Sequence, residues 1–143
     1  MSVLHCHSQG DKRFSAFYAY VDFLGMRDTI EKFYQLSKRI ESFAPSTIME
    51  GKGKKPTHFC VRGITFDASY ALLFYQTLWV MYFRQNPDLY EYARQFDDFH
   101  DRFKGKSKIN QENTIRRIVR IGLDEASKEC VPFVLYLKRQ VNK

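Results

Sequence analysis

Residues 68–83 read ASYALLFYQTLWVMYF, a run of sixteen residues without a formal charge in the middle of the chain. A transmembrane helix needs about 20 mostly apolar residues, and three polar side chains interrupt this run. A helix that is apolar on all sides is usually buried in a globular protein. We therefore expect a buried central helix, capped by Asp67 and ending before Pro87, and no association with a membrane.

The length and composition fit one globular domain spanning residues 1–143. Single hydrophobic cores typically serve about 100 to 200 residues, and the chain has 143. Apolar residues make up 44% of it and include 13 Phe and 9 Tyr, which is enough apolar surface to offset the entropy of ordering the chain. Wholesale disorder is therefore excluded, and with only 7 Gly and 4 Pro so are collagen-like and Pro/Gly-rich architectures.

Local patterns along the rest of the chain predict an α+β fold dominated by helices, with a small antiparallel or mixed sheet. Apolar residues at helical spacing predict a first helix over residues 29–43, which Asp28 and Glu31 would open as a capping box. The expected strands lie at residues 2–7, 13–23 and in a hairpin within 57–66, and the other helices at 88–96, 111–123 and 131–141, the last with Pro132 in its first turn.

An excess of basic residues gives the chain a formal net charge of +7 at pH 7, so its field should attract anionic partners. Part of the excess is concentrated in two Lys-rich stretches, at residues 52–55 and 102–108. Since both stretches also contain Gly, Ser or Pro, a solvated loop explains each of them more simply than a dedicated phosphate-binding track.

The three cysteines, Cys6, Cys60 and Cys130, cannot all pair with one another, and no two are spaced as CxxC. This argues against a secreted disulfide scaffold and favours a reducing cytoplasm. The first residues lack the basic and apolar segments of a secretory signal, so we expect the mature protein to begin near Met1.

Histidine and cysteine residues near the N-terminus raise the question of a metal centre. His5, Cys6 and His7 would have to meet His58 and Cys60 from a second strand. Alternation along a strand places His5 and His7 on one face and Cys6 on the other, so a zinc site would require two adjacent strands in register. We expect core cysteines and hydrogen-bonded histidines instead, with no metal ion and no cofactor.

Other catalytic patterns are weak. The sequence contains no Gly-rich phosphate loop, GxSxG or HExxH motif, and neither Cys6 nor Cys60 has the basic surroundings of a nucleophile. The acidic stretch at residues 97–101 could bind a divalent cation, but helix capping and pairing with nearby Lys and Arg explain it better.

A polar stripe on the first predicted helix is the strongest candidate for chemistry. Glu31, Gln35 and Lys38 occupy positions i, i+4 and i+7, opposite the apolar residues that face the core. Such a stripe is usually solvated. It becomes the wall of a pocket only where another layer of chain, such as residues 13–20, folds over it.

Four short motifs carry a resemblance to known protein families. They are GDKRFSAF at residues 10–17, EKFYQLSK at 31–38, NPDL at 86–89 and FDDF at 96–99. With these motifs the chain resembles, nearly end to end, an uncharacterised early-protein family of T-even-type phages that is encoded near the phage DNA ligase. The resemblance implies expression in the cytoplasm of an infected bacterial host, and it brings no established activity.

The order and spacing of the motifs are also similar, more distantly, to the NADAR superfamily, whose members are linked to ADP-ribose and N-glycosidic chemistry. There a strand reading F-S-N-F precedes a helix reading E, aromatic, aromatic, Q and then K. The matching residues here are Phe14, Ser15 and Phe17 for the strand, and Glu31, Phe33, Tyr34, Gln35 and Lys38 for the helix. The resemblance implies a NADAR-like core.

Three departures accompany this second resemblance. Ala16 stands where the superfamily has Asn, Phe99-His100 replaces its Trp-Gly, and its terminal helix motif is only loosely echoed at residues 111–117. These departures bear on catalysis more than on ancestry, so binding without hydrolysis stays an alternative.

The NADAR resemblance implies a pocket that binds, and could hydrolyse, an ADP-ribose or nucleotide N-glycoside. Glu31 would stabilise positive charge on the sugar or activate water, and Lys38 would hold a phosphate or leaving-group oxygen. The ligand-binding residues that it implies are Arg13, Phe14, Ser15, Phe17, Tyr34 and Gln35, with the rings stacking on a base and Arg13 pairing with a diphosphate.

A non-enzymatic role is the alternative. A host-takeover protein could bind nucleic acid or an acidic host protein through a basic, aromatic surface. Its basic residues would be Arg116, Arg117, Arg120, Lys138, Arg139 and Lys143. An amphipathic helix with its arginines in water explains the first three equally well.

Overall fold

The structure of the protein is a computed structural model that describes residues 2–101 and 109–142. The chain forms a helix-dominated α+β fold with small sheets, as predicted. Three of the features discussed above, the start at Met1, the Lys-rich stretch 102–108 and Lys143, lie outside the described residues.

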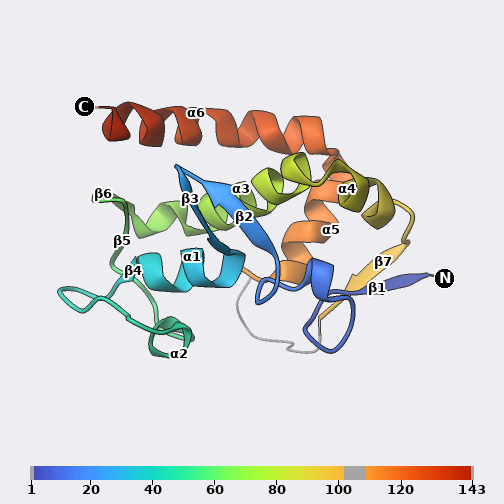
Figure 1. Cartoon of the computed structure of the whole chain (residues 1–143), viewed down its shortest axis with the longest axis horizontal. Coiled ribbons are helices and arrows are strands. Elements are labelled where there is room, and N and C mark those ends of the chain that lie inside the picture. Colours follow the sequence, from blue (N-terminus) through green and yellow to red (C-terminus); the bar gives the residue numbers. More distant parts are fainter. Residues whose placement is uncertain (1, 102–108, 143) are drawn as a thin grey trace.

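Helix α3 (Ala71–Gln85) runs through the middle of the molecule, as the uncharged run predicts (Figure 1). Asp67 caps the short 3-10 helix η2 (Ala68–Tyr70) that leads into it. Phe74 and Trp79 on α3 are completely buried. In the described part of the chain, no helix is both long and apolar enough to cross a membrane.

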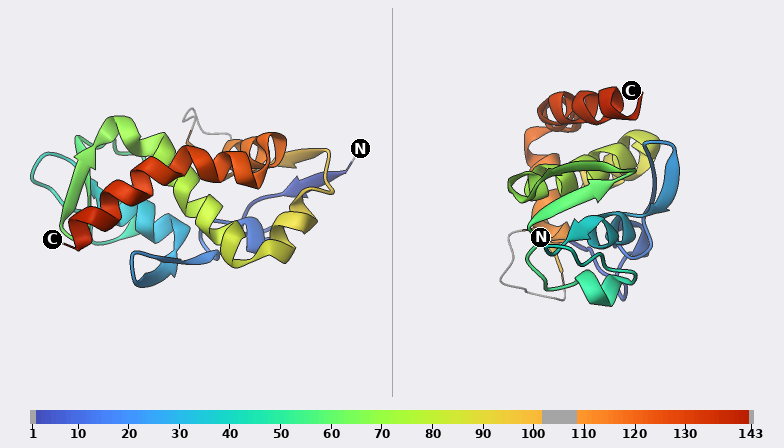
Figure 2. Two further views of the ribbon diagram at one scale, coloured as in Figure 1. Left: turned by 90° about the horizontal axis from the view of Figure 1, so that it is seen from above. Right: turned by 90° about the vertical axis from the view of Figure 1, so that its left-hand side faces the viewer.

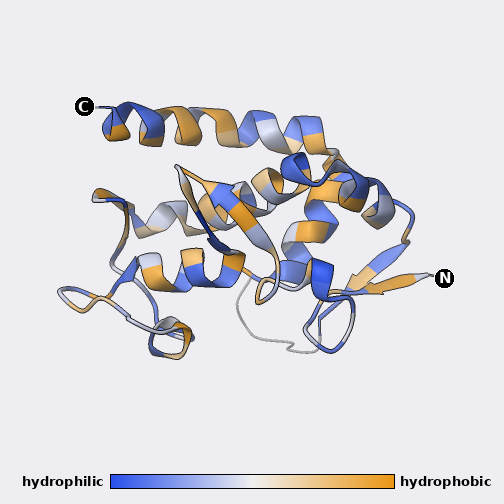
Figure 3. Cartoon of the chain, in the orientation of Figure 1, coloured by the Kyte–Doolittle hydropathy of each residue, from blue (hydrophilic) through white to orange (hydrophobic). Residues whose placement is uncertain are grey.

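The other helices are arranged around α3 in layers. Helix α6 (Leu123–Val141) packs on one face of α3 and α1 (Ile30–Ser37) on the opposite face, as the right-hand view of Figure 2 shows. Helix α6 carries hydrophilic and hydrophobic bands along its length (Figure 3), and its buried side chains include Phe133 and Leu137. The remaining helices are α2 (Ile48–Gly51), α4 (Pro87–Ala93) and α5 (Gln111–Ile121).

The strands form three small sheets within the described residues. The strands are β1 (Val3–His5), β2 (Tyr20–Phe23), β3 (Met26–Thr29), β4 (Lys38–Arg39), β5 (His58–Val61), β6 (Ile64–Asp67) and β7 (Asp98–His100). Strand β1 pairs with β7 in parallel, β2 with β3 as a hairpin, and β4, β5 and β6 form an antiparallel sheet. The predicted hairpin around Gly63 is β5 and β6, and Gly63 takes the left-handed conformation (φ 79°) that its turn requires.

The first helix is shorter than predicted and begins with a different cap. The Thr29 hydroxyl, not Asp28, accepts the N-terminal hydrogen bond, from the Lys32 N–H at 3.2 Å. The Asp28 carboxylate instead accepts from the Thr29 N–H. The helix ends at Ser37, because Lys38 turns into an extended strand and pairs with Phe59 of β5. Strand pairing with a distant segment therefore overrides the helical spacing of the local sequence.

The predicted strand over residues 13–23 is also only partly correct. Residues Lys12–Phe14 form a 3-10 helix, η1, because the Asp11 carboxylate caps its first turn by accepting from the Arg13 N–H. A paired strand begins only at Tyr20, in β2. This segment does not pair with β1, whose partner is β7.

The last helix begins eight residues earlier than predicted, at Leu123. Gly122, with φ at 93°, ends α5 and starts α6. Asp124 and Glu125 then favour a helix start, since carboxylates stabilise the first turn. Pro132 consequently lies inside the helix rather than in its first turn.

A charged network joins α3, α5 and α6. The Arg117 guanidinium donates to both carboxylate oxygens of Glu129, at 2.6 and 2.7 Å, and to Gln76 Oε1 at 2.7 Å. The Gln76 amide donates to Glu129 at 2.9 Å. The hydrogen bonds from Arg117 and then from Gln76 lower the pKa of Glu129 from 4.5 to about 2.

Replacing Glu129 with Gln should lower the free energy of unfolding at pH 7 by about 0.5–1 kcal/mol. The effect is small because the Arg117 and Glu129 side chains are 39% and 42% exposed. Since folding lowers this pKa, the contribution is fully present above pH 4.5 and is lost as the pH falls towards about 2. Urea unfolding of both proteins measures it, and a difference that is unchanged in acid would contradict the assignment.

Candidate functional site

A pocket of about 710 Å³ opens beside α1. Five of the eight site residues suggested by the sequence line it, namely Phe17, Glu31, Tyr34, Gln35 and Lys38. The other walls come from the loop at residues 52–56, the start of α3, Asp101 and the N-terminal end of α5. The volume lies within the range of about 300–1,000 Å³ that is typical of small-molecule sites.

The layer of chain that the polar stripe requires is present. The N–H groups at the start of a helix have no hydrogen-bond acceptor within the helix. Here the loop before β2 supplies carbonyl acceptors for two of them. Ile30 N donates to Ala19 O at 2.9 Å, and Glu31 N donates to Ala16 O at 3.0 Å. These bonds hold the loop against the first turn of α1, and Phe17 of the loop then lines the same pocket as Glu31.

Glu31 and Gln35 form a buried pair on the pocket wall. Glu31 is 8% exposed and Gln35 is 7% exposed. Gln35 Nε2 donates a hydrogen bond to Glu31 Oε1 at 2.9 Å. The other amide atom, Gln35 Oε1, is buried and has no hydrogen-bond partner among the described residues. A buried acceptor without a donor costs stability.

Lys38 reaches the same pocket from β4. It is 5% exposed, and its Nζ donates to Gly51 O and to Lys54 O, both at 3.0 Å. The ammonium also lies 5.2 Å from the centre of the Tyr34 ring. Burial lowers the pKa of Lys38, while the nearby Glu31 carboxylate opposes that shift. Lys38 thus holds the loop at residues 52–56 in place, and an ammonium has one further N–H to offer a ligand.

Gly51 allows α2 to approach α1 closely. A Cβ atom at this position would lie 2.7 Å from Gln35 O and 3.2 Å from Gln35 Oε1. A side chain here would therefore displace both the helix and the amide that orients Glu31. The glycine thereby positions the carbonyl that Lys38 uses.

Aromatic side chains and lysines complete the walls. The Lys52 ammonium lies 4.8 Å from the centre of the Phe17 ring. The rings of Tyr34 and Tyr75 meet edge to face with centroids 5.1 Å apart. Burial, and then the Glu31 carboxylate, raise the pKa of Tyr34 to about 12 and raise that of Tyr75 as well. Both phenols therefore stay protonated at neutral pH and can donate hydrogen bonds.

The charge around the pocket favours an anionic ligand. Four lysines and two carboxylates are among the lining residues. The lysines at residues 52–55, which the sequence suggested to be a solvated loop, form the rim of the pocket together with the buried Lys38. Phosphate groups are attracted to such a rim.

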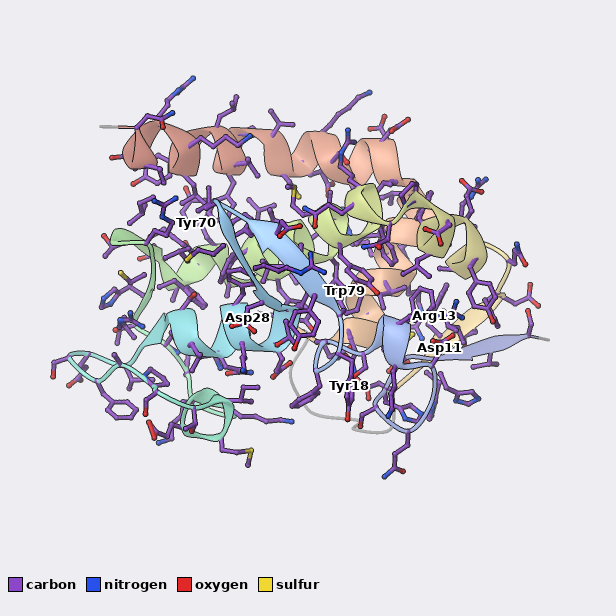
Figure 4. The ribbon with its side chains drawn as sticks, viewed as in Figure 1. Asp11, Arg13, Tyr18, Asp28, Tyr70 and Trp79 are labelled. Atoms are coloured by element: carbon purple, nitrogen blue, oxygen red, sulfur yellow. The ribbon has the colours of Figure 1, made fainter. Side chains whose placement is uncertain are left out.

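Three other predicted ligand residues are not among those lining the pocket. Arg13 donates to both carboxylate oxygens of the neighbouring Asp11, at 2.9 and 2.7 Å (Figure 4). Its guanidinium also lies over the Tyr92 ring, 4.7 Å from the ring centre. Phe14 is completely buried in the core. Ser15 is buried too, and its hydroxyl has no partner among the described residues. These positions differ from expectation because residues 12–14 form a 3-10 turn instead of a strand.

Two further residues line the pocket that no sequence pattern had identified as site residues, Tyr75 and Gln111. Gln111 Oε1 accepts the Ala16 N–H at 2.7 Å, so it fixes the loop that carries Phe17. A signal was present for Gln111, because it shares one face of its helix with the buried Ile115 and Ile118. Tyr75 gave no signal, since it lies within the uncharged run of α3.

The acidic stretch pairs with one nearby arginine of α5, Arg116, as the sequence suggested for that stretch. Arg116 contacts Asp98 at 3.1 Å and Glu112 at 2.7 Å, and Arg117 contacts Glu129. These arginines therefore have intramolecular partners. Arg120, Lys138 and Arg139 are exposed.

The cysteines match the expectation for core residues in part. Cys6 and Cys130 are buried and Cys60 is half-buried, and all three are free thiols. Burial raises the pKa of Cys6 far above its ordinary value, so it is not a thiolate nucleophile. His58 and Cys60 belong to a different sheet from β1, so they do not join His5 and His7.

No protein-family model matches the chain, and no curated protein matches it significantly. The pocket combines a buried acid and amide, a buried lysine, aromatic walls and a lysine-rich rim. These groups suit an anionic ligand that also carries a flat ring.

Proposed function

We propose that the protein binds a phosphorylated N-glycoside, of the ADP-ribose or nucleotide class, in this pocket and hydrolyses its N-glycosidic bond. One observation carries the proposal. Glu31, Gln35 and Lys38, each less than one-tenth exposed, converge on one cavity with aromatic walls. Burying an acid and an amine costs stability, and such groups concentrate where a ligand uses them.

The carboxylate suits the chemistry of this reaction. As the C–N bond breaks, positive charge builds on the sugar, and the oxygen of a water molecule bonds to the anomeric carbon while the base departs with the electron pair. Glu31, held by Gln35, would stabilise that charge or take the proton from the attacking water. Protonated Tyr34 and Tyr75 would donate hydrogen bonds to the ligand.

The remaining groups suit binding of the ligand. Lys38 and the rim lysines would hold its phosphates, and Phe17 would stack on its base. Arg13 is not assigned a diphosphate here because Asp11 already occupies its guanidinium. The resemblance to the NADAR superfamily supports the same ligand class, and the resemblance to the phage family would place the protein in the cytoplasm of an infected bacterium.

ADP-ribose should raise the melting temperature of the protein. At a concentration a hundred times the Kd, the stabilisation is about 2.7 kcal/mol, or roughly 5–10 °C for a chain of this size. Lys38→Met should remove most of this shift, because the buried ammonium and the loop that it holds both contribute to binding. Differential scanning fluorimetry with ADP-ribose, NAD, AMP and ribose provides the measurement.

Lys32→Met is the matched control, since Lys32 lies on the exposed side of the same helix and does not line the pocket. It should keep the full shift. Circular dichroism checks that Lys38→Met remains folded. If no phosphorylated compound stabilises the protein at millimolar concentration, the proposal is wrong, and salt-sensitive binding of nucleic acid without turnover would then favour the non-enzymatic role.

A further inference from the structure

Three of the four histidines of the chain gather at one end of the molecule, where β1 lies beside β7 (Figure 1). His5 ends β1, His7 follows two residues later, and His100 ends β7. One ring nitrogen of each lies within 4.8 Å of those of the other two. The His5 ring centroid is 5.8 Å from that of His7 and 5.6 Å from that of His100.

The backbone fixes this arrangement. His5 and His100 are register partners in the parallel pair, and the Cys6 N–H donates to His100 O at 2.8 Å. The turn that follows is closed by hydrogen bonds to His5 O and His7 O. Gly10 is required in this turn, because a Cβ atom there would lie 2.5 Å from His5 O. The three rings are therefore brought together by strand pairing and a tight turn.

The imidazoles have few hydrogen bonds of their own. His100 Nδ1 is buried and has no partner among the described residues, which is a costly state for a ring nitrogen. His7 Nδ1 accepts the Gln9 N–H at 3.3 Å, at the long end of the hydrogen-bond range. His5 is exposed. A metal ion bound by His100 would give Nδ1 a partner or, if bound by the other ring nitrogen, would fix the orientation of the ring. The only hydrogen bond named here that it could displace is the weak one from Gln9 to His7.

We propose that His5, His7 and His100 form a binding site for a Zn²⁺-class divalent transition-metal ion, with water as its fourth ligand. In a tetrahedral site with bonds of about 2.0–2.1 Å, the ligand nitrogens lie about 3.3 Å apart. The nitrogens must therefore close in by roughly 1–2 Å, which requires the side chains of the exposed His5 and the half-buried His7 to rotate towards His100. Neutral imidazole is the ligand that zinc, copper and nickel share.

This proposal departs from the expectation of no metal, and the reason is topological. The sequence offered His58 and Cys60 as partners for His5 and His7, and those residues lie in another sheet. The third ligand comes instead from β7, far away along the chain. The ion would join the N-terminal strand to β7, whether or not the pocket beside α1 binds a glycoside.

Titration of the full chain with Zn²⁺, in the presence of a non-chelating reductant, tests the site. Isothermal titration calorimetry should show one ion per chain with a low-micromolar or tighter Kd. His5→Ala and His7→Ala should each weaken binding at least tenfold, because each removes one of three ligands. The His5 and His7 side chains lie outside the core, so both variants should fold. If His100→Ala also folds, it tests the third ligand in the same way.

His58→Ala is the matched control, because it removes the one histidine outside the cluster, and it should bind Zn²⁺ like the parent. Co²⁺ in place of Zn²⁺ should give visible d–d bands without the near-ultraviolet charge transfer of a thiolate ligand. The proposal is overturned if the parent binds no ion, if His5→Ala and His7→Ala bind as tightly as the parent, or if the Co²⁺ spectrum shows cysteine ligation.

Discussion

Replacing Glu31 with Gln should lower the rate of N-glycoside hydrolysis by about 10²- to 10⁴-fold, the usual contribution of a positioned acid or base. Glutamine has the same size as glutamate and can keep the contact with Gln35, so the fold and the binding of ADP-ribose should persist. What it loses is the negative charge that stabilises the developing cation. Chromatographic detection of adenine or nicotinamide released from ADP-ribose or NAD measures the effect.

Glu125→Gln is the matched control for this variant. Glu125 is an exposed glutamate on α6 that pairs with Lys128, so its substitution should leave turnover unchanged. A Glu31→Gln protein that hydrolyses at the parental rate would show that Glu31 is not the catalytic carboxylate. A parent that binds ADP-ribose but releases no base would identify a binding protein, which the departures from the superfamily motif allow.

The parts of the fold that the sequence predicted are those governed by neighbouring residues. The uncharged run defines α3 because its burial requires no particular partner, and the β5–β6 hairpin follows from strand residues on both sides of Gly63. The errors arise where distant segments pair. Lys38 leaves the predicted helix to pair with Phe59, and the sequence did not predict β7, the strand that pairs with β1. No local pattern encodes either contact.

The candidate site was predictable only in the part that depends on local spacing. The stripe of Glu31, Gln35 and Lys38 was visible as spacing, and Lys38 lines the pocket even though it sits on a strand. The sequence could not decide whether the stripe was solvated, because that depends on the loop that Gln111 holds across it. Burial of a polar stripe is a tertiary property, so only the structure reveals it.

Replacing Phe74 with Ala should lower the free energy of unfolding by about 3–5 kcal/mol. Phe74 is completely buried on α3. Its ring contacts aromatic side chains from α1, β2, β5, β6 and α6, with centroid separations of 5.2 to 6.3 Å. Removing the Phe74 ring leaves a cavity between several elements that all pack against it. The surrounding rings are rigid and lie on separate elements, so they cannot all move in to fill the cavity. Urea unfolding followed by circular dichroism measures the loss.

Leu72→Ala on the same helix is the control, because Leu72 is 52% exposed and its substitution should cost less than about 1 kcal/mol. Tyr34, which lines the pocket, packs against Phe74, so Phe74→Ala should also weaken ADP-ribose binding at a temperature where the variant is still folded. If Phe74→Ala costs no more than Leu72→Ala, then α3 does not organise the core. In that case the pocket wall would depend on the loop contacts of α1 alone.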